Sequence, residues 1–390
     1  MPDRSPLRDT CAARRLAERF LTAWLAVALV PCGTRASAGE TTGYRVELVD
    51  PVSPTAPARA YEVVQSRDEN GFPLEYSLSF ETHVCTDGQC KPVDVTLVWN
   101  AVGCFERLEH PPDKPLTKKD HVPFTLDDYA KLDRILKDRN SILAGWTLAY
   151  LERPTQDGDA VDAVDAVTAP TPATVRDSII EDAAYTTWTL WQWANGSIVP
   201  KLRAITGESC TPVYLKHLLA SADRRFVDFA LDYLVERHPS DRQFVDSVLR
   251  VLENGEREQI DRCLEFLRRA ISDRQERHAR LIEACCRMPM AERPMVLQRL
   301  AAEPDLPAST LEGLTGRLGQ LPYFSIHLIL RMLEQRKFAS EKSISDVAAL
   351  LEGDDFFIAR RAYEHLVRHD LDSATQAKVE AFRRRHRDRL

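Results

Sequence analysis

Glycine is scarce in this chain of 390 residues, which has 15 glycines against 23 prolines. Glycine-rich loops hold phosphate groups by letting the backbone approach closely, so this scarcity argues against the common nucleotide-binding enzymes. The chain also lacks the G-x-S-x-G, Walker A and H-E-x-x-H patterns of serine hydrolases, P-loop enzymes and zinc proteases. Basic charge is not in excess either, because 52 Lys and Arg stand against 59 Asp and Glu. A net charge of −7 therefore excludes nonspecific nucleic-acid binding as the main role.

Residues 1–38 have the pattern of a secretory signal peptide. A basic stretch precedes an apolar run from Phe20 to Pro31, and Ala36-Ser37-Ala38 supplies small residues at the cleavage position. The run is too short to span a bilayer comfortably, so we expect no transmembrane segment after cleavage. We predict export to the periplasm or the extracellular space. Leu29–Cys32 leaves a lipoprotein signal open as an alternative, and an uncleaved anchor is another.

Export changes how the cysteines are interpreted, because disulfides persist in oxidising compartments. Cys85 and Cys90 flank a segment with the Asp-Gly pair that is typical of a β-hairpin turn. We therefore predict a disulfide between Cys85 and Cys90. A metal site that adds His83 and Cys104 is one alternative, and unpaired thiols are the other.

Short runs that alternate between apolar and polar residues extend from Tyr44 to Trp99, and Val93–Trp99 is the clearest of them. Asn-Gly and Asp-Gly turns separate such runs, which predicts an antiparallel sheet. Two helices are expected after it: one behind a capping box of Thr125 and Asp128, and one over residues 171–195. Residues 39–205 are thus predicted to form an α+β domain.

Helical periodicity continues from about residue 206 to residue 390, with short polar or proline-containing breaks between apolar stripes. This rhythm resembles an irregular α-solenoid of the HEAT kind, and a plain helical bundle is the alternative. Cys263, Cys285 and Cys286 lie among Leu and Ile at helical spacing, so they are expected in the core. An α-solenoid implies that another protein binds to this domain.

One segment points to a cofactor. Asp165, Thr168 and Thr171 have the spacing D-x-x-T-x-x-T directly ahead of the second predicted helix. This segment resembles the flavinylation motif of the FMN-binding domain family, to which the C subunit of the sodium-pumping NADH:quinone reductase and the G subunit of the Rnf complex belong. The resemblance covers about residues 60–200 and implies FMN attached to Thr171 through a phosphoester.

The resemblance also implies a setting for the phosphate. A phosphate on Thr171 would lie at a helix N-terminus, where free N–H groups favour negative charge, and Arg176 would add a cation. Trp146, Tyr185 and Trp188 are the flat apolar side chains expected near an isoalloxazine ring. The motif is degenerate, however, because Ala and Pro at positions 169–170 replace the family's Gly and Ala.

These observations predict an exported, non-enzymatic interaction protein with a degenerate FMN-binding-like domain, no bound cofactor, and a helical domain that binds another protein. The alternative is an exported flavoprotein electron carrier with FMN on Thr171.

We expect the chain, coexpressed with a flavin transferase, to show no flavin absorbance after denaturation, because Pro170 lacks an N–H for the phosphate. Thr171→Ala should then weaken only helix capping, by about 1 kcal/mol of unfolding free energy. The measurement is the visible absorbance of the denatured protein, which reports covalently attached flavin. Absorbance present in the wild type and lost in Thr171→Ala would establish the electron carrier instead.

Overall fold

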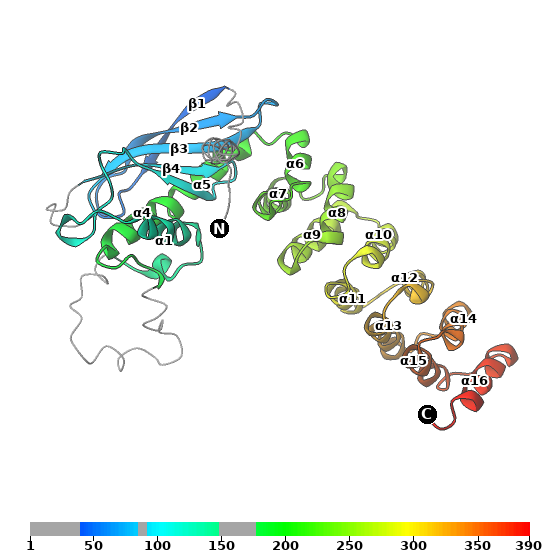
Figure 1. Ribbon diagram of the computed structural model, residues 1–390. Coiled ribbons are helices and arrows are strands. Elements are labelled where there is room, and N and C mark those ends of the chain that lie inside the picture. Colours follow the sequence, from blue (N-terminus) through cyan, green and yellow to red (C-terminus); the bar gives the residue numbers. More distant parts are fainter. Residues whose placement is uncertain (1–39, 85–91, 148–176) are drawn as a thin grey trace, which may run out of the picture.

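The structure is a computed structural model that describes residues 40–84, 92–147 and 177–390. An antiparallel sheet with helices against one face forms the N-terminal part, and a staggered array of helices extends from it to the C-terminus (Figure 1). The predicted fold class, an α+β domain followed by a helical-repeat region, is confirmed. In the part of the chain described here, no helix has the length and apolar character needed to cross a membrane.

The sheet is a meander in which each strand pairs with the next along the chain. Its strands are β1 (Thr41–Leu48), β2 (Arg59–Arg67), β3 (Pro73–Thr82), β4 (Val93–Asn100) and β5 (Phe105–Glu109). The first four coincide with the predicted alternating runs, and the Asn70-Gly71 turn joins β2 to β3 as expected. Gly71 has a φ of 77°, a conformation that glycine adopts without the usual steric cost. The sequence pattern did not predict β5.

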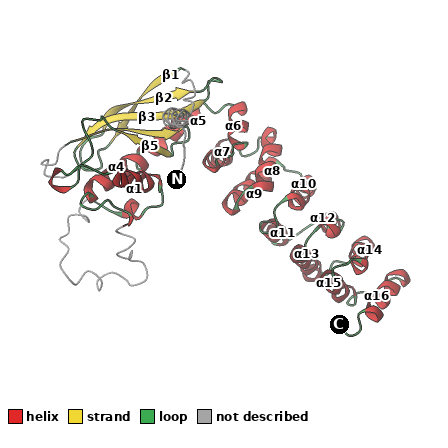
Figure 2. Ribbon diagram, in the orientation of Figure 1, coloured by secondary structure: helices red, strands yellow, loops and turns green. Residues whose placement is uncertain are grey.

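One face of the sheet is buried under helices α1 (Leu126–Lys137) and α4 (Ala184–Asn195), as Figure 2 shows. The capping box before α1 is confirmed: Thr125 accepts from the Asp128 backbone N–H and Asp128 accepts from that of Thr125. The Trp99 indole N–H donates to the Ala194 carbonyl over 2.7 Å, which ties β4 to the end of α4. The large indole rings of Trp99, Trp188, Trp191 and Trp193 all belong to this core.

The predicted helix over residues 171–195 is not continuous. Residues 171–176 lie outside the described part, residues 178–183 are not helical, and α4 begins at Ala184. Asp182 has a φ of 58°, so it cannot continue a right-handed helix. The Thr187 hydroxyl accepts from the Ile180 N–H over 3.1 Å and thereby holds the bend closed.

Helix α5 (Ile198–Glu208) joins the sheet to the helical array, and the predicted boundary between residues 205 and 206 falls inside it. Its Thr206 hydroxyl bonds to the Tyr76 hydroxyl over 2.7 Å and donates to the Ala101 carbonyl. Tyr76 in turn accepts from the Gln65 amide over 2.7 Å. These side chains are fully buried, so the chain of polar contacts fixes how α5 lies against the sheet.

The helical array consists of two rows, because alternate helices pack against each other along the chain (Figure 1). One row contains α6 (Pro212–Leu219), α8 (Val245–Asn254), α10 (Arg274–Arg287), α12 (Ala308–Thr315), α14 (Glu341–Ala349) and α16 (Ser373–Arg385). The other row, called the B row here, contains α7 (Arg224–Arg237), α9 (Arg257–Ala270), α11 (Arg293–Ala301), α13 (Tyr323–Arg336) and α15 (Phe356–Leu366). Each helix contacts mainly the helices one or two places away along the chain, which is typical of an open repeat array rather than of a closed bundle.

Equivalent positions recur at an almost constant interval. The ion pairs Arg242–Glu276, Arg280–Asp246 and Arg287–Glu253 each join residues 34 positions apart. The segment Ser-Asp-Arg-Gln occurs at residues 240–243 and again at 272–275, and in both copies the Asp caps the following helix. This interval is shorter than the roughly 40–47 residues of HEAT repeats.

Tyr76→Phe tests the buried contacts between α5 and the sheet. Removing the hydroxyl leaves Gln65 and Thr206 without their partner, so we expect a loss of about 1–3 kcal/mol in unfolding free energy. Urea unfolding followed by tryptophan fluorescence measures it. Tyr323→Phe, at a position that is 42% exposed, is the matched control and should change stability by less than about 0.5 kcal/mol. Equal effects of the two variants would contradict the role given to these contacts.

Candidate functional site

The residues predicted to bind flavin lie outside the described part of the chain. Asp165, Thr168, Thr171 and Arg176 all fall within residues 148–176, so FMN attachment stays a prediction. Cys85 and Cys90 fall within residues 85–91, and the same holds for the predicted disulfide.

The aromatic side chains expected around a flavin belong to the core of the sheet domain. Trp188 is 5% exposed, and its indole N–H donates to the Trp146 carbonyl over 3.1 Å. Trp146 and Tyr185 are partly buried and pack against the same core. All three therefore contribute to holding α4 against the sheet.

The cysteines and histidines of the described residues do not gather into a metal site: no cluster of three potential ligands occurs among them. Cys104 is buried, and burial raises the pKa of its thiol, whereas His83 is exposed. Cys263 and Cys285 lie in the core as predicted, and Cys286 is partly buried against it. Burial raises the pKa of Cys285 to about 12, so this thiol stays neutral and unreactive.

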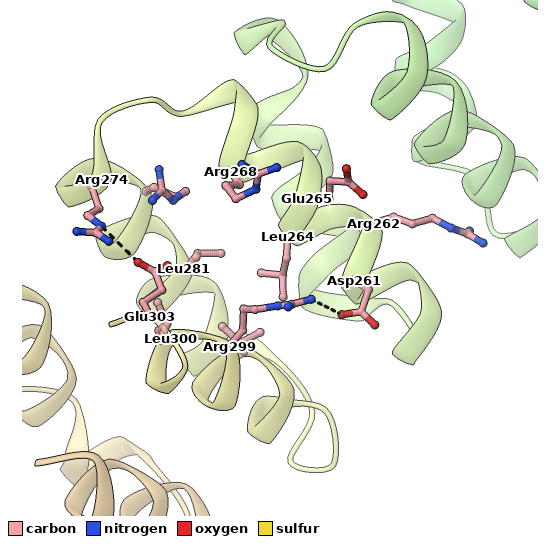
Figure 3. A pocket seen from close by; sticks show the side chains of 12 residues that line it. Asp261, Arg262, Leu264, Glu265, Arg268, Arg274, Leu281, Arg299, Leu300 and Glu303 are labelled. Carbon is pink, nitrogen blue, oxygen red and sulfur yellow. Dashed lines mark hydrogen bonds and ion pairs between the residues drawn. The ribbon is translucent and has the colours of Figure 1, made fainter. Parts of the chain in front are cut away.

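A groove lies between α9 and α11, and the start of α10 also lines it (Figure 3). It has a volume of about 730 Å³, within the range of roughly 300–1,000 Å³ typical of ligand sites. Its floor is apolar. The floor residues are almost fully buried and come from all three helices: Leu264, Leu281, Val296 and Leu300.

Charged side chains line the walls of this α9–α11 groove, with five arginines against three carboxylates. They are Arg262, Arg268, Arg274, Arg277 and Arg299, and Asp261, Glu265 and Glu303. In Figure 3, Arg262 points away from the other lining residues, and it pairs with Asp228 and Asp232 of α7, each over 3.1 Å. The side chains left at the groove are therefore richer in positive than in negative charge.

Two of the remaining arginines pair across the groove. Arg299 of α11 lies 3.2 Å from Asp261 of α9, and both side chains are more than half exposed. Arg274, at the start of α10, lies 3.3 Å from Glu303. An exposed pair such as Arg299–Asp261 contributes little to stability, so the Arg299 guanidinium can exchange its partner for a ligand carboxylate at low cost.

A buried histidine holds Glu303 in place. His278 of α10 is 1% exposed; its Nδ1 lies 2.9 Å from the Thr310 hydroxyl and its Nε2 lies 3.2 Å from a Glu303 oxygen. Burial lowers the pKa of His278 and outweighs the opposite effect of Glu303. His365 repeats this arrangement in α15, with Nδ1 3.1 Å from Glu334, and burial lowers its pKa too.

A second groove lies between α5 and α7 and has a volume of about 590 Å³. Its lining contains Arg203 and Arg237 against three carboxylates, those of Glu208, Asp232 and Glu236. The two grooves thus differ in the sign of their charge.

The α9–α11 groove was not predicted from the sequence. Its arginines are spread over residues 262–299 and come from three helices, so no local motif unites them. The repeated Ser-Asp-Arg-Gln segment was the available signal, because it aligns consecutive helix pairs and would have shown which side chains share a row. Comparison of the chain with family models, curated proteins and solved structures finds no match.

The two buried histidines predict how stability depends on pH. Unfolding returns them to a pKa of about 6.5, so below that pH the unfolded chain binds more protons than the folded chain. Their stabilising contribution is complete above about pH 6.5, and the unfolding free energy falls as the pH drops below it. We expect a lower urea midpoint, followed by circular dichroism, at about pH 5.5 than at about pH 8.

The double variant His278→Gln/His365→Gln should show a smaller drop between the two pH values. His217→Gln, at an exposed position of α6, is the control and should keep the full drop. An unchanged pH dependence in the double variant would show that these two histidines are not its source.

Proposed function

We propose that this chain is an exported interaction protein whose helical domain binds another protein. The observation that carries the proposal is the α9–α11 groove, with its buried apolar floor and its walls of arginine. Apolar floors with a few charged groups at the edge are typical of protein-binding sites, in which arginine is enriched. The pattern of residues 1–38 supports export.

The form of the helical domain favours the same function. Each helix pair contacts mainly its neighbours, so a solenoid grows in one direction and presents a long surface without a central active site. Two grooves of opposite charge lie on one molecule, and a partner that matches both would be selected by charge as well as by shape. In this proposal the N-terminal domain is a degenerate FMN-binding-like module that supports the first helices.

The flavoprotein electron carrier remains the alternative, and the spacing of Asp165, Thr168 and Thr171 is the observation that favours it. The two proposals make different demands on the α9–α11 groove. A protein-binding role requires it to be accessible, whereas an electron carrier with FMN on Thr171 does not use it.

The test blocks the groove without removing its arginines. Glu265→Trp places an indole ring in the opening, and Gln298→Trp places the same ring at an exposed position of α11 that does not line the groove. Tagged full-length chains are incubated with the extracytoplasmic fraction of the native cell. We expect the same proteins to be recovered with the wild type and Gln298→Trp, and to be lost with Glu265→Trp. Equal recovery with all three, or recovery with none, would contradict the proposal.

A further inference from the structure

We propose that the α9–α11 groove binds an extended acidic segment of the partner protein, in which apolar side chains alternate with Asp or Glu. This inference rests on the proposed function and specifies the chemistry of what is bound. It follows from the charges in the groove, from their contrast with the second groove, and from the floor.

Two arginines of the α9–α11 groove have no carboxylate partner among the described residues. Arg268 is exposed and makes no ion pair there. Arg277 is half-buried and donates only to the Ile271 carbonyl, over 2.9 Å. Glu265, the nearest carboxylate along α9, pairs with Arg269 over 2.6 Å. Arg268 and Arg277 therefore have donors free for a ligand carboxylate, which a guanidinium binds with two parallel hydrogen bonds.

This excess of positive charge runs against the charge of the whole chain and of the second groove. The chain as a whole has a net charge of −7, and the α5–α7 groove has more carboxylates than arginines. In that second groove Arg203 lies 4.0 Å from Asp232, whose other oxygen pairs with Arg262 of α9. The charge of the α9–α11 groove therefore differs both from that of the whole chain and from that of the α5–α7 groove.

The apolar floor of the groove determines which other side chains the bound segment carries. Leu264, Val296 and Leu300 are each no more than 8% exposed, so the floor accepts aliphatic side chains without requiring polar groups to be desolvated. Figure 3 shows Leu264 and Leu281 between Arg268 and Arg274 on one side and Arg299 on the other, with Leu300 beside Arg299. A segment in extended conformation points successive side chains in opposite directions, so alternate residues meet the floor and the arginines.

The experiment uses the full chain and a short fluorescein-labelled peptide in which Leu alternates with Glu. Two matched peptides carry Gln or Lys at every Glu. We expect fluorescence anisotropy to show saturable binding of the acidic peptide alone, and the binding should weaken with added salt because the arginines are exposed. Arg268→Glu should weaken it roughly tenfold or more, because it replaces a charge-assisted bond with repulsion.

Arg384→Glu is the control for the change in total charge, since this exposed arginine lies on α16, far from the groove along the chain. It should leave the affinity unchanged. Equal affinity for the Gln peptide, an equal loss in Arg384→Glu, or equally tight binding of a heparin or DNA oligomer at the groove would each overturn the inference.

The experiments distinguish a failure of the acidic-segment inference from a failure of the proposed protein-binding function. If Glu265→Trp abolishes recovery of a partner while the acidic peptide does not bind, the helical domain binds protein but the segment is not acidic. If neither the partner nor the peptide depends on the groove, the proposed function fails as well.

Discussion

A helix pair in this array cannot bury its apolar surface alone, and that constraint governs the whole molecule. Pairs inside the array pack against a neighbour on each side, and the first pair packs against the sheet domain. Phe72, in the turn between β2 and β3, stacks on Tyr214 of α6 at 4.7 Å between ring centroids. The Tyr214 hydroxyl donates to the Pro73 carbonyl over 3.3 Å, and Arg225 of α7 lies 2.7 Å from Glu106 of β5. The sheet domain therefore serves as the N-terminal cap of the array.

The same constraint separates the parts of the B row that must pack from the parts that are free to bind. Leu264, Leu281 and Val296 are buried because α9, α10 and α11 share one core. The arginines at the edge of that core contribute little to it, since their charged ends remain near water and their ion pairs are exposed. The residues of the floor are therefore constrained by packing, whereas the residues of the walls are not. Substitutions in the walls can suit a partner without loss of the fold.

The sequence patterns predicted those strands and helices that are determined by residues close together in the chain. Alternation predicted β1 to β4, and the side chains of Thr125 and Asp128 predicted the start of α1. Strand β5 has only 5 residues and hydrogen-bonds to β4 alone, so its pattern is too short to recognise. The break in the helix at Asp182 depends on a backbone conformation that the residue type does not predict. The α9–α11 groove depends on side chains from three helices, which no local pattern brings together. The repeat was hidden because its apolar positions vary, whereas its helix caps and ion pairs recur.

The role proposed for the α9–α11 groove is to bind another protein. Hydrogen exchange of the full chain, with and without the acidic Leu-Glu peptide, tests it most directly, because protection is read along the whole array. We expect slower exchange in α9, α11 and the start of α10, and no change in α5, α7 or α15. Protection confined to the α5–α7 groove, or none anywhere at saturating peptide, would contradict it.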